Sequence, residues 1–491
     1  MRNLPTKIHI QNTLTGKETE LPIWKNGITR LFVCGPTVYD RLHIGNARTY
    51  ASFDNFVKFL RYTGIKVRYI QNITDIDDKI IKKAEEEKTT PEEIAQKYTK
   101  IFKENMRALD ITSVDKYLPA TDYIQEIISQ VERLIEKNYA YKIEKDLTAD
   151  KAGGYYFDLS KFPDYGKLAG RTIEQAEDGV SRIDENENKK NRGDFCLWKF
   201  PKTNLPLSKK KTKKPILLDG EPVWWAPFGW GRPGWHIEDT AISEKELGPQ
   251  YEIHGGGRDL IFPHHEAEIA EQESVSGKKP FVQLWMHTGL MTVEGKKMSK
   301  SLGNFITVDE FLKNNDANLF RLIVAMHHYR SAMDISERET TAAKEALNNI
   351  KEFFAKLDLI TKKGVKEKNE ENLKTLISFE EKFVGGLTED LNTPKSLAAV
   401  FESINKFSQN IWKLNKLTAK NIKSSFENHL KILGIKIEYT KPDKSTEKII
   451  KEREIFRNKK EFSKSDELRR QIEAKGYKID DTPLGPLVYK N

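Results

Sequence analysis

Hydrophobic residues near the N-terminus recur first with the spacing of a strand and then with that of a helix. The apolar run 31–33 predicts a strand, and after a Gly-Pro break and a His-Ile-Gly-Asn turn the apolar positions recur with helical spacing through residue 60. Gly64 ends that pattern, and 66–74 predicts the next strand. These elements predict a βαβ unit, with a short hairpin at 6–25 beside its first strand.

The following stretch alternates helical patterns with short strand-like pieces. Apolar residues recur with helical spacing at 91–108 and again at 122–137. Residues 140–198 contain short apolar pieces around a polar stretch, and we interpret them as an inserted subdomain. A strand at 282–287 and the Gly/Asn-rich loop after it close the α/β half.

From Val308 onward the pattern is almost purely helical and predicts a helix bundle. Residues 438–447 indicate a linker, and 462–490 a last small unit. The predicted fold class is therefore α/β with a parallel sheet, followed by a mostly helical region and a small C-terminal unit.

Composition narrows the class of protein without identifying it. Charged residues make up 32% of the 491 residues, and 82 basic against 73 acidic side chains give a modest net charge of +9. Two cysteines exclude a disulfide scaffold and favour a reducing compartment. No apolar run approaches membrane-spanning length, so we expect a cytoplasmic protein with no membrane partner. We interpret the lysine-rich loop 209–214 as a solvated insertion rather than an RNA contact.

The turn 43–46 is the first candidate site. It opens a helix directly after a strand, where free backbone N–H groups and the positive end of the helix dipole attract anions. Gly45 lets a ligand approach the backbone closely. A nucleotide phosphate would fit there, while the alternative for His43 is a helix cap.

A second candidate site has the donors of a metal centre. His264 and Glu268 are four residues apart just after Pro263, a favoured first helical residue, so both are expected on one face of a helix. Cys34 ends the first strand in the same predicted crevice. Three further histidines compete as ligands, namely His236, His254 and His265.

Two short motifs and four longer strings resemble a known enzyme family. The turn 43–46 and the string 297–301 each lie where a strand of an α/β domain ends, and together they resemble the two signatures of class I aminoacyl-tRNA synthetases. Four longer strings are Cys34-Gly-Pro-Thr-Val-Tyr-Asp40, Asn72-Ile-Thr-Asp-Ile-Asp-Asp78, Gly231-Arg-Pro-Gly-Trp-His-Ile-Glu238 and His254-Gly-Gly-Gly-Arg-Asp-Leu260. They are similar to strings of the cysteinyl-tRNA synthetase family, and the resemblance extends over nearly the whole chain.

The resemblance implies a Rossmann-like catalytic domain with an inserted subdomain, followed by regions that contact tRNA. The expected divisions are the first half of the catalytic domain at 1–115, the inserted subdomain at 116–222, the second half with the signature loop at 223–305, a stem-contact region at 306–340, a helical tRNA-binding bundle at 341–435 and a small C-terminal anticodon-binding unit at 450–491.

The implied reaction is activation of L-cysteine by ATP as cysteinyl adenylate, and transfer of cysteine to the 3′ end of tRNA(Cys). Catalysis then rests on positioning and on stabilisation of charge that develops on the phosphates, with ATP entering as its Mg2+ complex. The residues implied in catalysis are His43, Asn46, Lys297 and Lys300, and Gly45 and Ser299 join them in binding ATP. The residues implied in the cysteine pocket are Thr74, Trp235 and His254.

The resemblance also implies one Zn2+ per chain that binds the substrate thiol directly. The positions matching its ligands are Cys34, Asp239, His264 and Glu268. The family normally has cysteine at position 239. An aspartate binds zinc through oxygen and keeps the charge of a thiolate, but it makes the site harder and less selective. Zinc would explain the choice of substrate, because a serine hydroxyl mimics a bound thiolate poorly.

Two other functions fit parts of the sequence. A cysteine ligase of mycothiol biosynthesis, which acts on a small amine, resembles the catalytic domain but lacks an anticodon-reading unit. This chain continues with 388–394 and 465–485, which resemble the tRNA-binding half. A non-catalytic RNA-binding paralogue is the second alternative, and it would have no reason to keep the lysines of 297–301.

The C-terminal unit departs from the family in one respect. A tryptophan commonly follows the last glycine, whereas this chain reads Pro-Leu-Val at 486–488. A stacking contact to an anticodon base, worth about 1 to 3 kcal/mol, would be lost unless another residue replaces it. We expect a monomer whose partners are tRNA(Cys), L-cysteine and ATP.

Overall fold

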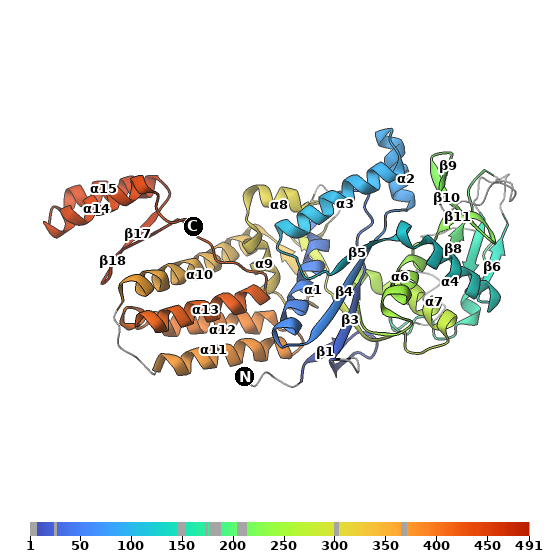
Figure 1. The fold of residues 1–491 in the computed structure, drawn as a ribbon, viewed down its shortest axis with the longest axis horizontal. Coiled ribbons are helices and arrows are strands. Elements are labelled where there is room, and N and C mark those ends of the chain that lie inside the picture. The colour runs from blue at the N-terminus through green and yellow to red at the C-terminus, as the bar shows by residue number, and fades with distance from the viewer. Residues whose placement is uncertain are drawn as a thin grey trace.

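A five-stranded parallel sheet lies at the centre of the computed structural model (Figure 1). Its strands, in spatial order, are β13 (Val282–Thr288), β12 (Tyr251–Gly257), β3 (Ile28–Val33), β4 (Lys66–Ile73) and β5 (Lys116–Pro119). The chain runs from β3 to β4 on one side and later returns to β12 on the other, so the carboxyl end of β3 is the switch point of the sheet. The structure describes residues 7–23, 27–144, 153–171, 175, 188–203, 214–298, 304–364 and 371–490.

Helix α1 (Ile44–Tyr62) connects β3 to β4, which confirms the predicted βαβ unit. It is buried at 14 of its 19 residues, including the rings of Phe53, Phe56 and Phe59. The reason is visible in Figure 1, where α1 lies between the sheet and the C-terminal helices. Burial on several faces also encloses polar residues of α1.

The other elements of the first half follow the predicted pattern closely. The hairpin consists of β1 (His9–Asn12) and β2 (Lys17–Glu20). Helix α2 (Asp78–Glu87) precedes α3 (Pro91–Ala108), whose bounds equal the predicted ones because Thr90 and Glu93 form a capping box around Pro91. Helix α4 (Ile124–Glu136) corresponds to the pattern at 122–137.

The inserted region forms a six-stranded sheet at the right of Figure 1. In spatial order its strands are β6 (Ala140–Ile143), β7 (Gly154–Phe157), β8 (Phe195–Lys199), β11 (Gly229–Pro233), β10 (Glu221–Ala226) and β9 (Ile216–Leu218). Strand β11 pairs with β8, so the sheet continues past residue 222, where the insertion was expected to end. Cys196 lies in β8 and is half-buried.

Helices α6 (Ile237–Leu247) and α7 (Glu266–Ser276) follow this sheet and carry the predicted metal ligands. Phe262 has extended backbone angles (φ −137°, ψ 131°), and it is the one residue of Ile261–His265 with non-helical angles. Helical backbone therefore resumes at Pro263 and continues into α7, as the sequence predicted. His264 and Glu268 lie four residues apart on one face, with His264 Nε2 2.9 Å from Glu268 Oε1.

A small three-stranded sheet follows β13 and leads to the C-terminal half. It consists of β14 (Met291–Val293), β15 (Lys296–Lys297) and β16 (Met333–Ile335). Helices α8 (Val308–Asn314) and α9 (Ala317–Ala325) lie between β15 and β16 in the chain. The short 3-10 helices are η1 (Ala120–Tyr123), η2 (Leu159–Lys161), η3 (Arg258–Leu260) and η6 (Ile411–Lys413).

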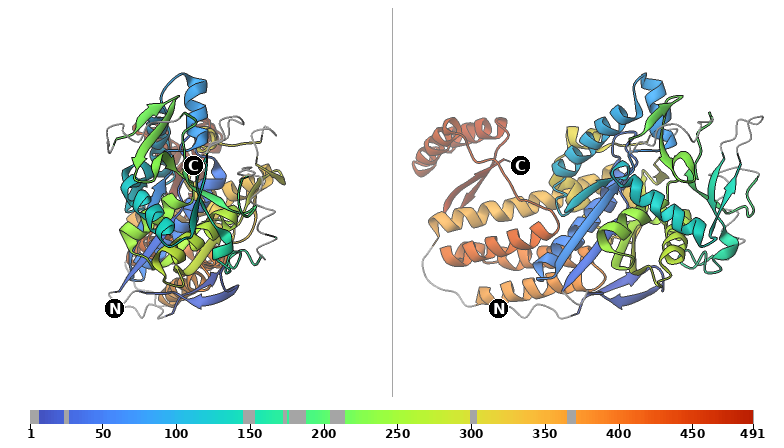
Figure 2. Two further views of the ribbon diagram at one scale, coloured as in Figure 1. Left: turned by 90° about the vertical axis from the view of Figure 1, so that its right-hand side faces the viewer. Right: turned by 45° about the vertical axis from the view of Figure 1, so that its right-hand side comes forward.

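Four helices form the predicted bundle beside α1, seen at the left of Figure 1 and from two other sides in Figure 2. They are α10 (Glu337–Lys363), α11 (Glu371–Thr388), α12 (Thr393–Ser408) and α13 (Lys416–Ile432). The rings of Phe379 and Phe426 stack in the core with centroids 4.2 Å apart. Among the described helices, none combines the length and the apolar character that crossing a bilayer requires.

The last unit consists of α14 (Lys444–Asn458), α15 (Phe462–Ala474), β17 (Lys478–Thr482) and β18 (Gly485–Tyr489). It lies at the far end of the bundle (Figure 1). The predicted linker at 438–447 is only partly correct, because Asp443 caps α14 and the helix begins at Lys444. Few apolar residues mark this helix, so the hydrophobic pattern did not reveal it.

A buried ion pair joins α1 to the helical half. Arg321 of α9 donates to Asp54 Oδ2 of α1 at 2.7 Å, and both side chains are fully buried. The Nε of Arg321 donates to the carbonyl of Leu433, just after α13, at 3.0 Å. Burial alone would raise the pKa of Asp54, but Arg321 and Lys58 hold it below its usual value.

We expect Arg321→Met to destabilise the protein by about 3 kcal/mol or more, because it removes one of the two cations that compensate the buried carboxylate of Asp54 and leaves Lys58 as the other. Chemical denaturation measures this loss. The matched control is Lys382→Met, which removes one partner of the Lys382–Glu402 pair, whose side chains are 50% and 42% exposed. The control should lose less than about 1 kcal/mol, and equal losses in the two variants would contradict the role of the buried pair.

Candidate active site

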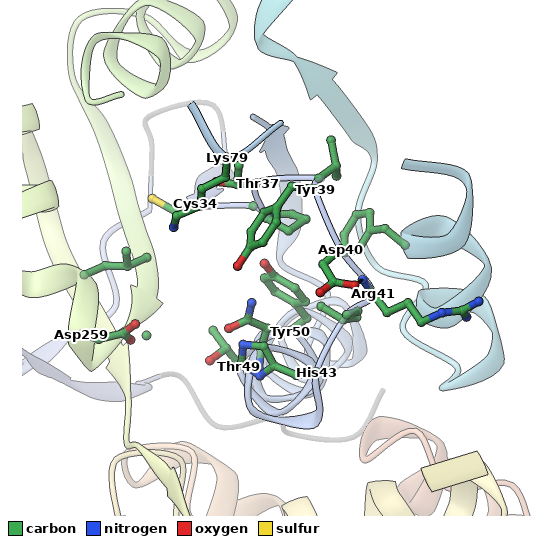
Figure 3. Close-up of a pocket in the computed structure, with 18 of the residues that line it drawn as sticks. Cys34, Thr37, Tyr39, Asp40, Arg41, His43, Thr49, Tyr50, Lys79 and Asp259 are labelled. Atoms are coloured by element: carbon green, nitrogen blue, oxygen red, sulfur yellow. Dashed lines mark hydrogen bonds between the residues drawn. The ribbon is translucent and has the colours of Figure 1, made fainter. Parts of the chain in front are cut away.

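A cavity of about 310 Å3 opens beyond the carboxyl end of β3. The loop between β3 and α1, the first turns of α1 and the end of β12 line it. Figure 3 shows Cys34 and Lys79 toward one end, His43 toward the other and Asp259 at the side. The cavity therefore lies at the switch point of the parallel sheet, where ligands bind in open α/β folds.

His43 caps helix α1 at one end of this cavity. Its Nδ1 accepts a hydrogen bond from the backbone N–H of Asn46 at 3.3 Å, and both side chains line the cavity. A Cβ at Gly45 would lie 2.9 Å from His43 Nδ1, so a larger residue would displace the ring. The first sequence motif thus presents a helix N-terminus and two polar side chains to the cavity.

One residue of the second motif and one residue after it contact the same turn. Met298 Cε, inside the motif, would lie 3.0 Å from a Cβ at Gly45, and the ring of Phe305 is 5.2 Å from the ring of His43. The second motif therefore lies beside the N-terminus of α1. Ser299 and Lys300 lie outside the described residues, and so does the side chain of Lys297.

Arg48 connects α1 to the segment that leads to the second motif. Its Nη1 donates to the carbonyls of Gly289 and Leu290 at 2.8 and 2.7 Å, and its Nη2 donates to the carbonyl of Ser331. Burial lowers the pKa of this guanidinium to about 10, so it stays charged at neutral pH. Arg48 therefore fixes the segment before the second motif against the helix that begins at the first motif.

Four predicted metal ligands lie together behind the other end of the cavity. The ligand atoms of Cys34, Asp239, His264 and Glu268 are all buried and within 4.8 Å of one another. His264 Nε2 is 3.0 Å from Asp239 Oδ2 and 2.9 Å from Glu268 Oε1. Cys34 Sγ is 3.6 Å from Glu268 Oε1. One thiol, two carboxylates and one imidazole are a donor set that divalent zinc accepts.

A second group of donors shares two members with the first. Cys34 and Glu268 also lie within 4.8 Å of His254 and His265. Cys34 Sγ is 3.3 Å from His254 Nε2 and 3.1 Å from His265 Nε2. Two of the competing histidines are thus beside the thiol, while the third, His236, contacts His264 Nδ1 at 2.8 Å.

Asn72 links the backbone next to Cys34 to the carboxylate of Asp239. Its Oδ1 accepts from the backbone N–H of Gly35, next to Cys34, and its Nδ2 donates to Asp239 Oδ1. The second carboxylate oxygen of Asp239 is left facing His264. Gly35 permits this approach, because a Cβ there would lie 1.8 Å from the Asn72 carbonyl oxygen.

Negative charge accumulates around the thiol. Burial raises the pKa of Cys34 well above its usual value, and Glu268 and Asp239 raise it further. Burial raises the pKa of Glu268 to about 7, and burial together with the charge of Glu268 raises that of Glu271 well above its usual value. Burial alone would lower the pKa of His264, but Glu268 and Asp239 raise it to about 10. These groups together favour a cation in their midst.

The remaining histidines of the cluster have the opposite shift. Burial lowers the pKa of His236, His254 and His265 well below the usual value. Burial and the charge of Arg258 lower the pKa of His287 to about 3. These four imidazoles are therefore neutral at physiological pH, and each carries one N–H.

The three side chains predicted for the cysteine pocket occupy different positions. Trp235 lines the cavity, and its ring lies 4.4 Å from that of His264. Thr74 is buried and donates to Glu238 Oε2 at 3.0 Å. His254 is fully buried, where it contacts Cys34 and stacks on Trp285 at 4.5 Å. Trp235 alone of these three forms part of the cavity wall.

The cavity also contains polar residues to which the sequence motifs gave no role. Tyr39, Lys79 and Asp259 line it, and the ammonium of Lys79 lies over the ring of Tyr39 at 5.4 Å. Asp259 and Tyr39 lie inside the strings that carried the family resemblance, and Lys79 directly follows one. Their position in those strings was the signal that could have identified them.

Comparison with known proteins agrees with this geometry. The family described as "tRNA synthetases class I (C) catalytic domain" matches residues 21–345. The cysteine–tRNA ligase of Thermococcus onnurineus is 38% identical over 98% of this chain and 98% of its own length. Similar ligases occur in Methanococcus maripaludis, at 37% identity over 98% and 99%, and in Thermoplasma volcanium, at 39% over 96% and 97%.

Solved structures with little sequence similarity share the fold. A methionyl-tRNA synthetase of Mycobacterium tuberculosis in complex with methionyl-adenylate matches 83% of this chain and 89% of its own, with a TM-score of 0.57 at 14% identity. A LeuRS ternary complex from Agrobacterium radiobacter matches 84% and 85%, with a TM-score of 0.61 at 11% identity. At these identities the likeness supports the architecture alone.

Proposed function

This chain belongs to the cysteinyl-tRNA synthetase family of class I aminoacyl-tRNA synthetases, and we propose how its residues perform the reaction of that family. The protein activates L-cysteine with ATP and attaches it to tRNA(Cys). The observation that carries the proposed roles is the shared cavity, which has a helix N-terminus at one end and a buried thiol–carboxylate–imidazole cluster behind the other. A ligase of mycothiol type or a non-catalytic paralogue has no comparable support.

The N-terminus of α1 binds the phosphates in this proposal. The carboxylate of cysteine attacks the α-phosphorus of ATP, the bond to the β-phosphate oxygen breaks, and pyrophosphate leaves with the bonding electrons. His43 and Asn46 donate hydrogen bonds to the phosphates, and Gly45 allows them close to the backbone. No protein nucleophile is needed, so the residues act by positioning and by stabilising charge.

The second motif supplies the cations for the leaving group. Met298 in this motif and Phe305 just after it lie beside the N-terminus of α1. We therefore assign Lys297 and Lys300 to the pyrophosphate, together with Ser299 and the Mg2+ that accompanies ATP. Two ammonium groups near the leaving phosphates offset the charge that develops as the bond breaks.

We assign Zn2+ to Cys34, Asp239, His264 and Glu268. The fit rests on the donor set itself, because three acidic groups are buried with a single basic imidazole and need a cation for compensation. When bound, zinc would hold the thiolate of the substrate and so distinguish cysteine from serine. Asn72 orients Asp239 for this role, and Trp235 forms the neighbouring cavity wall. We place Thr74 and His254 behind that wall, where they support the cysteine pocket.

The helical half is assigned to tRNA. We propose that 306–340 contacts the acceptor stem, and that the bundle at 341–435 and the unit at 450–491 bind the rest of the tRNA and read its anticodon. Pro486 stands at the position of the missing aromatic residue, and Val488, two residues later, packs against the apolar cluster of Ile472, Tyr477 and Ile479. We propose that an anticodon base stacks elsewhere on this unit. We also propose that the protein acts as a monomer in the cytoplasm.

Lys300→Ala should lower cysteine-dependent ATP–pyrophosphate exchange about 10²- to 10³-fold, because it removes one stabilising charge from the transition state. Binding of tRNA(Cys), measured by filter retention, should change by less than about threefold, since one cation contributes little to a large polyanion interface. Lys296→Ala removes an exposed lysine just outside the motif and is the matched control. Equal losses of exchange and tRNA binding, or absence of cysteine-dependent exchange in the unaltered protein, would contradict the assignment.

Zinc analysis of the purified protein should give about one ion per chain. Asp239→Cys should raise the affinity for zinc about tenfold or more, because a thiolate is a softer ligand than a carboxylate. Asp259→Asn serves as the control, since Asp259 lines the cavity outside the donor cluster and its loss should leave the zinc content unchanged. Zinc-free protein, or equal affinities in the Asp239→Cys variant and its parent, would refute this metal assignment.

A further inference from the structure

The second motif begins at the end of a tight β-hairpin. Strand β14 pairs with β15 so that Thr292 lies opposite Lys297, the first residue of the motif. Glu294 and Gly295 connect the two strands, and both have left-handed backbone angles, with φ values of 48° and 72°. A two-residue turn of this kind fixes the register of a hairpin. The position of the Lys297 backbone therefore depends on this turn and on whatever holds β14.

Asp334 of β16 holds this hairpin from the side. Its Oδ1 accepts a hydrogen bond from the hydroxyl of Thr292 at 2.6 Å and another from the backbone N–H of Gly295 at 2.8 Å. Strand β16 also pairs in parallel with β14, with Asp334 beside Thr292. One carboxylate oxygen therefore joins the strand and the turn that precede Lys297.

The turn at 328–331 leads into β16 and is held on two sides. On one side lies Arg48 of α1, which donates to the carbonyl of Tyr329 at 3.4 Å and to that of Ser331. The backbone N–H of Gly289 also donates to the Tyr329 carbonyl, at 2.7 Å. A Cβ at Gly289 would clash with the carbonyl of Ser331, so only glycine permits this close packing.

On the other side of this turn lies Asp390, from the loop between α11 and α12. Its Oδ1 accepts from the hydroxyl of Tyr329 at 2.6 Å, and its Oδ2 accepts from Nε of Arg330 at 2.6 Å. The backbone N–H of Gln11 in the N-terminal hairpin also donates to Asp390 Oδ1, at 2.8 Å. The carboxylate is buried, so these protein donors replace the water that it would otherwise bind.

The loop that contains Asp390 has a strained backbone. Asp390 and Leu391 have φ values of 54° and 49°, in a region that residues with side chains rarely adopt. Strain of this kind persists where surrounding contacts outweigh it, and it is common at functional positions. The loop belongs to the string 388–394, which resembled the tRNA-binding half of the family and had no role in the chemistry.

We propose that Asp334 and Asp390 are positioning residues for the second motif. Asp334 fixes the hairpin that ends in Lys297, and Asp390 fixes the turn from which β16 extends. The inference rests on the role proposed above for Lys297 in stabilising the leaving pyrophosphate. It adds that the helical half contributes to the activation of cysteine, a step that needs no tRNA.

Asp334→Ala should lower kcat of cysteine-dependent ATP–pyrophosphate exchange about tenfold, because a misplaced cation stabilises the leaving group less. The KM for cysteine should change less than about twofold, since the donor cluster behind the other end of the cavity is unaltered. Asp334→Asn keeps Oδ1 as the acceptor of both hydrogen bonds and should retain exchange within about twofold of the parent. Rates are expressed per cysteine-binding site, counted by calorimetric titration, which removes the contribution of unfolded protein.

Asp390→Asn replaces one acceptor oxygen by a donor, so the hydrogen bond from either Tyr329 or Arg330 is lost. This variant should lower kcat of exchange about threefold or more. Glu389→Gln is the matched control, because it makes the same chemical change at a neighbouring carboxylate that is 64% exposed and pairs with Lys395. The control should stay within about twofold of the parent, and equal rates for the two variants would overturn the role of Asp390.

A double variant separates positioning from general damage to the fold. Because Asp334 acts through Lys297 in this proposal, Asp334→Ala should cost less than about twofold once Lys297→Ala is present. A further tenfold loss in that background, or an Asp334→Asn variant as impaired as Asp334→Ala, would overturn the proposal. Parental exchange in the single variant Lys297→Ala would instead overturn the role of the second motif on which the proposal rests.

Discussion

Uncompensated negative charge beside Cys34 is the constraint on which the rest of the site depends. A buried thiol lies next to two buried carboxylates, Asp239 and Glu268, and His264 is the one basic group of this set. Burying such groups without a counter-charge is costly, so the fold must supply a cation or protons. The side chains around the thiol limit the negative charge in two ways. Asn72 turns one oxygen of Asp239 inward, and neutral histidines surround the sulfur without adding further charge.

Helix α1 links the acidic cluster around Cys34 to the turn at 43–46, which we assigned to the phosphates of ATP. Its N-terminus faces the cavity, and Arg48 near that end holds the carbonyls of the segment that leads to the second motif. Farther along, Asp54 receives Arg321 from the helical half. One rigid helix therefore sets the distance between the donor cluster around Cys34, the turn at 43–46 and the helical half. Such precision is what a reaction without a protein nucleophile requires.

Much of the fold could be predicted because its elements have clear periodicity or end signals. Helical spacing placed α3 at 91–108, where Thr90 and Glu93 cap its start around Pro91, and the apolar run at 31–33 located the central strand. Helix α14 was missed because its sequence is mostly charged. The kink at Phe262 was missed because it depends on tertiary contacts, and hydrophobic spacing contains no information about them. Burial of Arg48 and Asp54 on α1 likewise follows from the layers packed around that helix.

The candidate site, like the fold, could be predicted from the sequence only in part. Spacing and motif strings indicated the four donors of the first group, and the structure places them within 4.8 Å of one another. The sequence could not separate them from His254 and His265, because the distances of these two rings from Cys34 depend on how β12 and the segment before α7 pack together.

The central claim is that a metal held by Cys34, Asp239, His264 and Glu268 selects the amino acid through its sulfur. X-ray absorption at the zinc edge, recorded on zinc-loaded protein before and after addition of L-cysteine or L-serine, tests this claim most directly. The account predicts one sulfur among the zinc ligands of the free protein, two after addition of cysteine, and no change with serine. A sulfur count that cysteine leaves unchanged would contradict it.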